Sequence, residues 1–136
     1  MGKISGPLLD RVDIHVELPS VKYKELTDTK DSEGSGAIKA RVERARAIQR
    51  ERFKSERLFY NAQMNAKLIK KYCILENKAK ELLKMAMTEL GLSARAYDKI
   101  RKVARTITDL AGCESIKAEH LSGAIQYRSL DRDFFV

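Results

Sequence analysis

The pattern of apolar and polar positions divides the chain into a short alternating segment and a long region with helical periodicity. Residues 12–18 alternate strictly between apolar and polar side chains, which is the period of a half-buried strand. Just upstream, Pro7 suits the first position of a short helix, where a missing N–H costs no hydrogen bond. No other segment alternates in this way, and buried backbone groups need partners. We therefore expect residues 1–20 to hold a short helix and a strand whose sheet lies in a longer chain.

The rest of the chain predicts a flexible linker followed by helices. The linker is expected over residues 21–36, because residues 27–36 are polar and rich in Gly and Ser. Apolar residues at helical spacing then predict helices over 37–58, 62–71, 77–90, 94–110 and 117–128. Gly91 is expected to end the third of these in the left-handed region, and Ser93 to cap the next. The predicted fold is mainly α, a small helical bundle over residues 37–136 preceded by a remnant strand.

Composition narrows the class of protein. The chain has 136 residues, of which 43% are hydrophobic and 34% charged, as in ordinary globular domains. No apolar run is long enough to span a bilayer and no leader pattern opens the chain, so we expect a cytoplasmic protein without membrane partners. Two well-separated cysteines and two isolated histidines do not form a zinc-ligand pattern. We expect reduced thiols and no metal site.

Positive charge is concentrated in one predicted helix. The chain carries 27 basic and 19 acidic residues, a net charge of +8, which favours polyanionic partners. Residues 39–57 contain eight basic residues against three glutamates. This helix could contact nucleic acid, with Arg46 and Arg50 as the contacting residues. A solvated helix face explains the same charges more simply, and both interpretations stay open.

Arg11 stands at the junction between the short helix and the predicted strand. At the rim of a sheet, an arginine can reach a neighbouring subunit's nucleotide and stabilise charge on a transferred phosphoryl group. The alternative is a surface arginine paired with Asp10 or Asp13.

Arg95 falls in the first turn of the helix that Ser93 is expected to cap. The positive end of the helix dipole disfavours a cation there but attracts anions. An arginine at this position is therefore reasonable if a phosphate binds nearby. A solvated arginine, or one paired with Asp98, is an equally good interpretation.

Five motifs, taken together, resemble a known family. In order, they occupy residues 5–15, 61–64, 92–97, 103–110 and 124–132, and read SGPLLDRVDIH, NAQM, LSARAY, VARTITDL and AIQYRSLDR. This sequence resembles the C-terminal part of Mg-chelatase-like AAA+ ATPases of the bacterial competence-protein type. The resemblance covers nearly the whole chain apart from the 27–36 loop.

The resemblance implies a fold and two residue roles. Residues 1–20 would be the end of the AAA+ α/β core, and residues 37–136 the C-terminal helical lid. Arg11 resembles the family's arginine finger and Arg95 its sensor-2 residue. Two further arginines, Arg105 and Arg128, lie in matching motifs without an assigned role.

The resemblance also implies what the parent protein does. It would be a Mg²⁺-dependent ATPase that binds ATP and forms a ring, expected to be hexameric, from neighbouring subunits. The partners expected are the rest of its own chain, those neighbouring subunits and DNA. The 136 residues contain no GxxxxGK[ST] phosphate loop, so we expect no cofactor and no ATP hydrolysis from this chain alone. The alternative is an autonomous basic helical module for nucleic-acid binding or oligomerisation.

Overall fold

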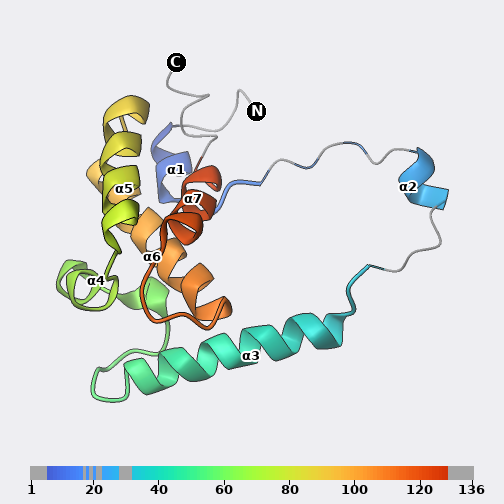
Figure 1. The fold of residues 1–136 in the computed structure, drawn as a ribbon, viewed down its shortest axis with the longest axis horizontal. Coiled ribbons are helices and arrows are strands. Elements are labelled where there is room, and N and C mark those ends of the chain that lie inside the picture. Colours follow the sequence, from blue (N-terminus) through green and yellow to red (C-terminus); the bar gives the residue numbers. More distant parts are fainter. Residues whose placement is uncertain (1–5, 17, 19, 21–22, 28–31, 129–136) are drawn as a thin grey trace.

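The computed structural model describes residues 6–16, 18, 20, 23–27 and 32–128, and these are mainly helical (Figure 1). The helices are α1 (Gly6–Arg11), α2 (Tyr23–Thr27), α3 (Ser35–Arg52), the 3-10 turn η1 (Asn61–Gln63), α4 (Ala66–Tyr72), α5 (Asn77–Leu90), α6 (Ala94–Leu110) and α7 (Ala118–Gln126). The predicted small helical bundle is confirmed.

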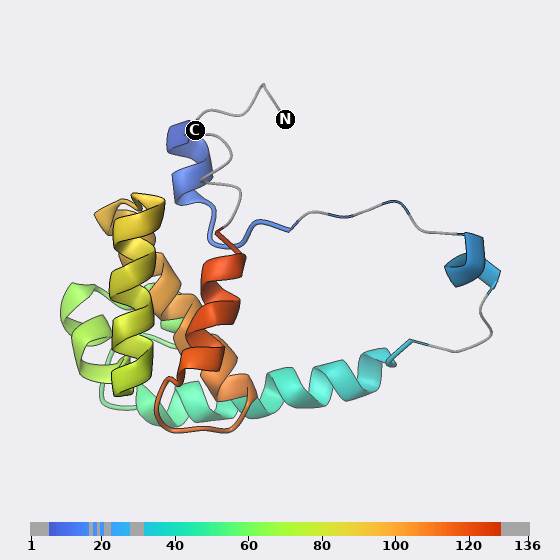
Figure 2. The same cartoon turned by 45° about the horizontal axis from the view of Figure 1, so that its top comes forward.

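Helix α6 is the centre of the bundle. It packs against α3, α4, α7 and the turn η1, and α7 in turn packs against α5. Both views show α6 lying among these helices (Figures 1 and 2). Its Ile100 and Ala104 are fully buried beside Leu83 of α5 and Leu121 of α7. Burial of such side chains stabilises the fold by about 1.5–3 kcal/mol each. The core therefore holds the middle of α6 in place.

Local capping sets the ends of the central helices. Gly91 follows α5 with φ 59° and ψ 39°, the left-handed conformation expected there. Ser93 then caps α6, its hydroxyl accepting a hydrogen bond from the Ala96 N–H at 3.1 Å. Both predicted caps are confirmed, and α5 and α6 have the predicted bounds.

Helix α3 ends earlier than its sequence pattern predicted. The helix expected to reach residue 58 stops at Arg52, because Phe53 turns into the core, where it is 1% exposed and its ring meets Tyr72 edge-on at 5.5 Å. At the other end α3 extends beyond the bundle (Figure 1). There the apolar side chains of Ile38 and Val42 are 43% and 40% exposed.

The strand expected over residues 12–18 is not formed, which corrects that prediction. Residues 12–16 and 18, the described part of this segment, form neither strand nor ladder. The His15 N–H donates instead to the Tyr127 carbonyl at 2.8 Å, at the end of α7. A strand needs a partner strand to satisfy its backbone, and in the described part of the chain the one isolated β-bridge joins Leu75 and Ile116.

The predicted linker contains helical residues. Helix α2 and the first residues of α3 lie within the 21–36 segment that was expected to be a loop. Among the described residues, no helix is long and apolar enough to cross a membrane.

Candidate functional site

A hollow at the N-terminal end of α6 brings together the two arginines singled out in the sequence. Its volume is about 620 Å³, and its lining residues are Arg11, Arg95, Asp98, Lys99 and Lys102. Arg11 comes from the last position of α1 and the other four from α6. Residues far apart in the sequence thus meet at one place.

The register of α6 explains its contribution. Because Ser93 is the N-cap, Arg95 lies in the first turn, near backbone N–H groups that lack an intrahelical acceptor. Lys99 and Lys102 follow Arg95 by four and seven residues, so the three side chains share one helix face. The Arg95 side chain is exposed at this end of the helix.

Two contacts fix the segment that follows Arg11 to the bundle. Asp13 forms an ion pair with Lys99 of α6. Arg128, which is 2% exposed, donates a hydrogen bond from its guanidinium to the Val12 carbonyl. Arg128, whose role the sequence left open, therefore holds the residue that follows Arg11.

One of these contacts involves a residue considered as a partner of Arg11. Asp13, one of the two carboxylates considered as its partner, is engaged by Lys99. The side chain of Asp10, the other, lies outside the described residues.

The hollow is electrostatically suited to phosphate. Two arginines and two lysines line it together with one carboxylate, that of Asp98. Cations at the positive end of a helix attract oxyanions strongly. Within the described residues, no group of three His, Cys, Asp or Glu side chains could hold a metal ion. The side chains that line the hollow therefore carry a net positive charge, which favours an anion.

Arg46 and Arg50 lie elsewhere, on α3. Both side chains are exposed. The Arg46 guanidinium carbon lies 4.7 Å from the centroid of the Tyr60 ring, a cation–π contact. The structure thus separates these arginines from the hollow that holds Arg11 and Arg95.

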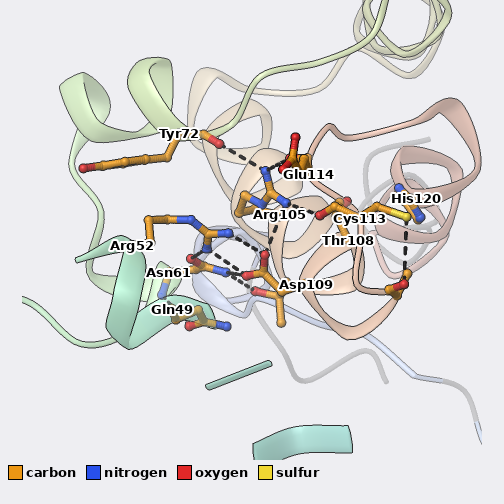
Figure 3. A network of polar contacts seen from close by, with 12 residues as sticks. Gln49, Arg52, Asn61, Tyr72, Arg105, Thr108, Asp109, Cys113, Glu114 and His120 are labelled. Carbon is orange, nitrogen blue, oxygen red and sulfur yellow. Dashed lines mark hydrogen bonds and ion pairs between the residues drawn. The ribbon is translucent and has the colours of Figure 1, made fainter. Parts of the chain in front are cut away.

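A buried polar network links α3 to α6 (Figure 3). Asp109 accepts two hydrogen bonds from Arg52, at 2.8 and 2.5 Å, and one from the Asn61 amide at 2.9 Å. Its carboxylate is fully buried and also lies 3.2 Å from Arg105. This bidentate pair closes the C-terminal end of α3 onto α6.

Arg105 fastens the segment that follows α6. Its guanidinium donates to the carbonyls of Glu114 at 2.7 Å, Cys113 at 3.1 Å and Tyr72 at 3.3 Å (Figure 3). Burial lowers the pKa of Arg105, and the Asp109 carboxylate opposes this shift. Sequence reasoning missed this network, because the 105–109 spacing is its only local signal.

The chain also matches known proteins. Residues 32–128 match the protein family described as magnesium chelatase, subunit ChlI C-terminal. The chain belongs to this family. The match includes Arg95 and the whole buried network, whereas Arg11 lies before it.

Individual members of the wider family extend the similarity to the N-terminal segment. Competence protein ComM of Haemophilus influenzae is 40% identical over 133 residues, 97% of this chain and 25% of the relative. Proteins named YifB from Salmonella typhimurium and Escherichia coli are 36% and 37% identical, each over 97% of the chain and 26% of the relative. The chain thus spans about a quarter of the length of the curated relatives it matches.

Proposed function

We propose that this chain is the C-terminal lid of an AAA+ ATPase and supplies two arginines to ATP hydrolysis. The observation that carries the proposal is the shared hollow of Arg11 and Arg95. Of the chain's arginines, these are the two that the family resemblance pointed to. Side chains from α1 and α6 that meet around one cationic hollow can act on one polyphosphate.

Arg11 has the properties of an arginine finger. It is exposed at the end of α1, on a segment that Asp13 and Arg128 hold to the bundle. A finger acts by stabilising charge that develops on the γ-phosphoryl oxygens in the transition state. A planar guanidinium on a fixed backbone suits this role better than a lysine, since it can grip two oxygens.

Arg95 has the properties of a phosphate-binding residue in the ground state. It stands at the N-terminal end of α6 with Lys99 and Lys102 on the same face. Since Arg95 lines the same hollow as Arg11, we propose that both residues serve the same nucleotide. If the finger reaches into a neighbouring subunit, Arg95 then acts across that same boundary.

ATP and Mg²⁺ complete this site only in the longer protein. The hollow fits phosphate oxygens, whereas a phosphate loop and the Mg²⁺ ligands would come from the α/β core. When bound, ATP with Mg²⁺ supplies the phosphoryl group and part of the charge neutralisation. This chain's residues bind and orient the phosphates and stabilise the charge on them.

We further propose that the ring, which we expect to be hexameric, acts on DNA. The support is the net charge of +8, the exposed Arg46 and Arg50, and the relative whose name is competence protein ComM. The second candidate, an autonomous nucleic-acid-binding module, is favoured by the same basic helix α3. The two candidate functions differ in whether activity depends on the hollow that Arg11 and Arg95 line.

The test is a comparison of two variants in the full ATPase that carries both the core and this segment. Arg11→Ala should lower ATP turnover and leave nucleotide affinity nearly unchanged, because a finger contributes in the transition state. Arg95→Ala should lower both, because its contact exists in the ground state. Lysine at either position should restore little.

The matched control is Arg57→Ala, an exposed arginine away from the hollow. It should leave both turnover and affinity unchanged. Equal kinetics for all three variants would reject the proposed roles of Arg11 and Arg95.

A further inference from the structure

Two adjacent aromatic rings are exposed on the turn that follows α3. Phe59 and Tyr60 are 64% and 45% exposed, although Phe53, a few residues earlier, is 1% exposed. Their ring centroids lie 6.4 Å apart with an interplanar angle of 57°. Adjacent aromatic rings exposed to solvent are typical of a surface that binds a ligand or a partner.

The turn that carries these rings is held in place by side chains. The Gln63 amide oxygen accepts the backbone N–H groups of Phe59 at 2.7 Å and Tyr60 at 3.1 Å. The next N–H, that of Asn61, donates to the Gln49 side chain at 3.0 Å. Because Asn61 is itself bound to the buried Asp109, the rings stand on a rigid base. The backbone entropy of this turn is therefore largely lost on folding, before any ligand binds.

Positive charge surrounds the rings. The Arg46 guanidinium lies over Tyr60 at 4.7 Å, and Arg50 follows one turn later on the same face of α3. The nearby carboxylates have other partners, since Glu51 binds Lys54 at 2.6 Å and Glu43 lies 3.9 Å from Lys39. Within the described residues, neither Arg46 nor Arg50 has a carboxylate partner.

A hollow adjoins the Tyr60 ring and offers room for a planar group. It has a volume of about 370 Å³, and its lining combines Tyr60 and Arg46 with apolar side chains of α3 and α6, among them Val42 and Leu110. Leu110 is 43% exposed. An aromatic wall, a guanidinium and an apolar floor therefore meet at one point of the surface.

We propose that Tyr60, Phe59 and Arg46 form a stacking site for the bases of single-stranded nucleic acid, with Arg50 contacting its backbone. Every base has a flat face that can stack on an aromatic ring or a guanidinium plane, and the neighbouring cations neutralise phosphates. An acidic protein surface would form ion pairs with the arginines but would offer no flat group to stack on the two rings.

This site deepens the DNA part of the proposed function and is independent of its ATP part. The stacking residues are on α3 and the turn after it, whereas Arg11 and Arg95 line the hollow at the other end of α6. Binding can be measured on the 136-residue chain without nucleotide. Its failure would leave the kinetic test of Arg11 and Arg95 unaffected.

The experiment is fluorescence anisotropy of a labelled oligothymidine titrated with this chain at low salt. Tyr60→Ala should weaken binding by about 5- to 150-fold, the effect of losing one stacked base. Tyr60→Phe keeps the ring and should stay within about twofold of the wild type. Tyr23→Ala removes a tyrosine that is 79% exposed on α2 and should leave the affinity for oligothymidine unchanged.

A second arm separates stacking from charge and from misfolding. An abasic oligonucleotide of the same length should bind the wild type more weakly than oligothymidine, and Tyr60→Ala should no longer distinguish the two. Arg46→Gln should weaken binding and lower its salt dependence more than Arg44→Gln, a matched change on another face of α3.

Three results would overturn the proposal. They are wild-type affinity in Tyr60→Ala, equal binding of the abasic and normal strands by the wild type, and absence of binding at low salt. In the last case the rings would serve a protein surface instead.

Discussion

At the scale of single residues, the arginines that the sequence singled out divide by burial into two kinds. Arg105 and Arg128 are 3% and 2% exposed and bind backbone carbonyls. Arg11, Arg46, Arg50 and Arg95 are exposed. The first kind holds the fold, and we propose that the second contacts phosphate. The sequence did not distinguish them, because burial is a tertiary property and each arginine has carboxylates nearby in the chain.

The Asp109 carboxylate is predicted to be the most sensitive polar group in the fold. Asp109→Ala leaves Arg52 and Arg105 without their shared acceptor inside the protein, so unfolding free energy should fall by about 3–5 kcal/mol. Glu89→Gln, a change at an exposed carboxylate of α5, should stay within about 0.5 kcal/mol. Urea unfolding followed by circular dichroism measures both. A loss below about 1 kcal/mol in Asp109→Ala would contradict the structural role of the network.

The burial of Cys73 predicts that the chain becomes less stable at alkaline pH. Burial raises the pKa of its thiol from 9.0 to about 11. Below pH 9 the thiol is protonated in both states, so the stability it contributes is fully present. Between pH 9 and 11 the unfolded chain ionises first, and unfolding free energy should fall by about 2 kcal/mol.

The measurement is the difference in unfolding free energy between the wild type and Cys73→Ala as the pH rises. Other titrating groups cancel in this difference, which should shrink from pH 9 to 11. Cys113→Ala, at a partly exposed thiol, serves as the control. A difference that stays constant with pH would show that Cys73 ionises normally.

At the scale of elements, helices with strong local signals could be predicted and tertiary boundaries could not. Gly91 and Ser93 encode the break between α5 and α6 in their own backbone and side-chain chemistry, so both helices were predicted with their observed bounds. The end of α3 depends on where Phe53 is buried and on an aspartate 57 residues away, which no local pattern contains. The alternating 12–18 segment has strand periodicity, but the residues that the structure describes provide no partner strand.

The candidate site was predictable in the same limited sense. The resemblance pointed to Arg11 and Arg95 separately, while their meeting in one hollow depends on how α1 packs on α6. Lys99 and Lys102 were not predicted, because at the sequence level they look like an ordinary solvated face. Tyr60 and Phe59 were missed because exposure cannot be read from two aromatic residues in a turn.

The segment after α1 should be anchored at one amide. In the wild type, hydrogen exchange should be fast over residues 12–16 except at His15, whose N–H is bonded to Tyr127, and slow along α6. Arg128→Gln removes the guanidinium that holds Val12. The His15 amide should then exchange about 10- to 150-fold faster, as expected for a lost charged hydrogen bond.

Arg44→Gln, at an exposed site of α3, should leave exchange at His15 unchanged. If Arg128→Gln also leaves it unchanged, then Arg128 does not position the segment that carries Arg11.

At the scale of the whole molecule, α6 joins the two proposed sites. Its first turns line the hollow with Arg11 and Arg95, and its last turns line the hollow beside Tyr60. A helix of 17 residues is about 25 Å long. The core packs around its middle, where Ile100 and Ala104 are fully buried.

The central claim, that Arg11 is an arginine finger, is tested most directly by ATP turnover of Arg11→Ala at saturating ATP in the full ATPase. Turnover should fall by about 10³- to 10⁵-fold, the contribution of such a residue in related phosphoryl transfers. Mixing these subunits with subunits whose phosphate loop is disabled should restore part of the activity, because a finger acts on its neighbour. Turnover within about twofold of the wild type, less than 0.5 kcal/mol in activation free energy, would show that Arg11 is a surface arginine and contradict the account.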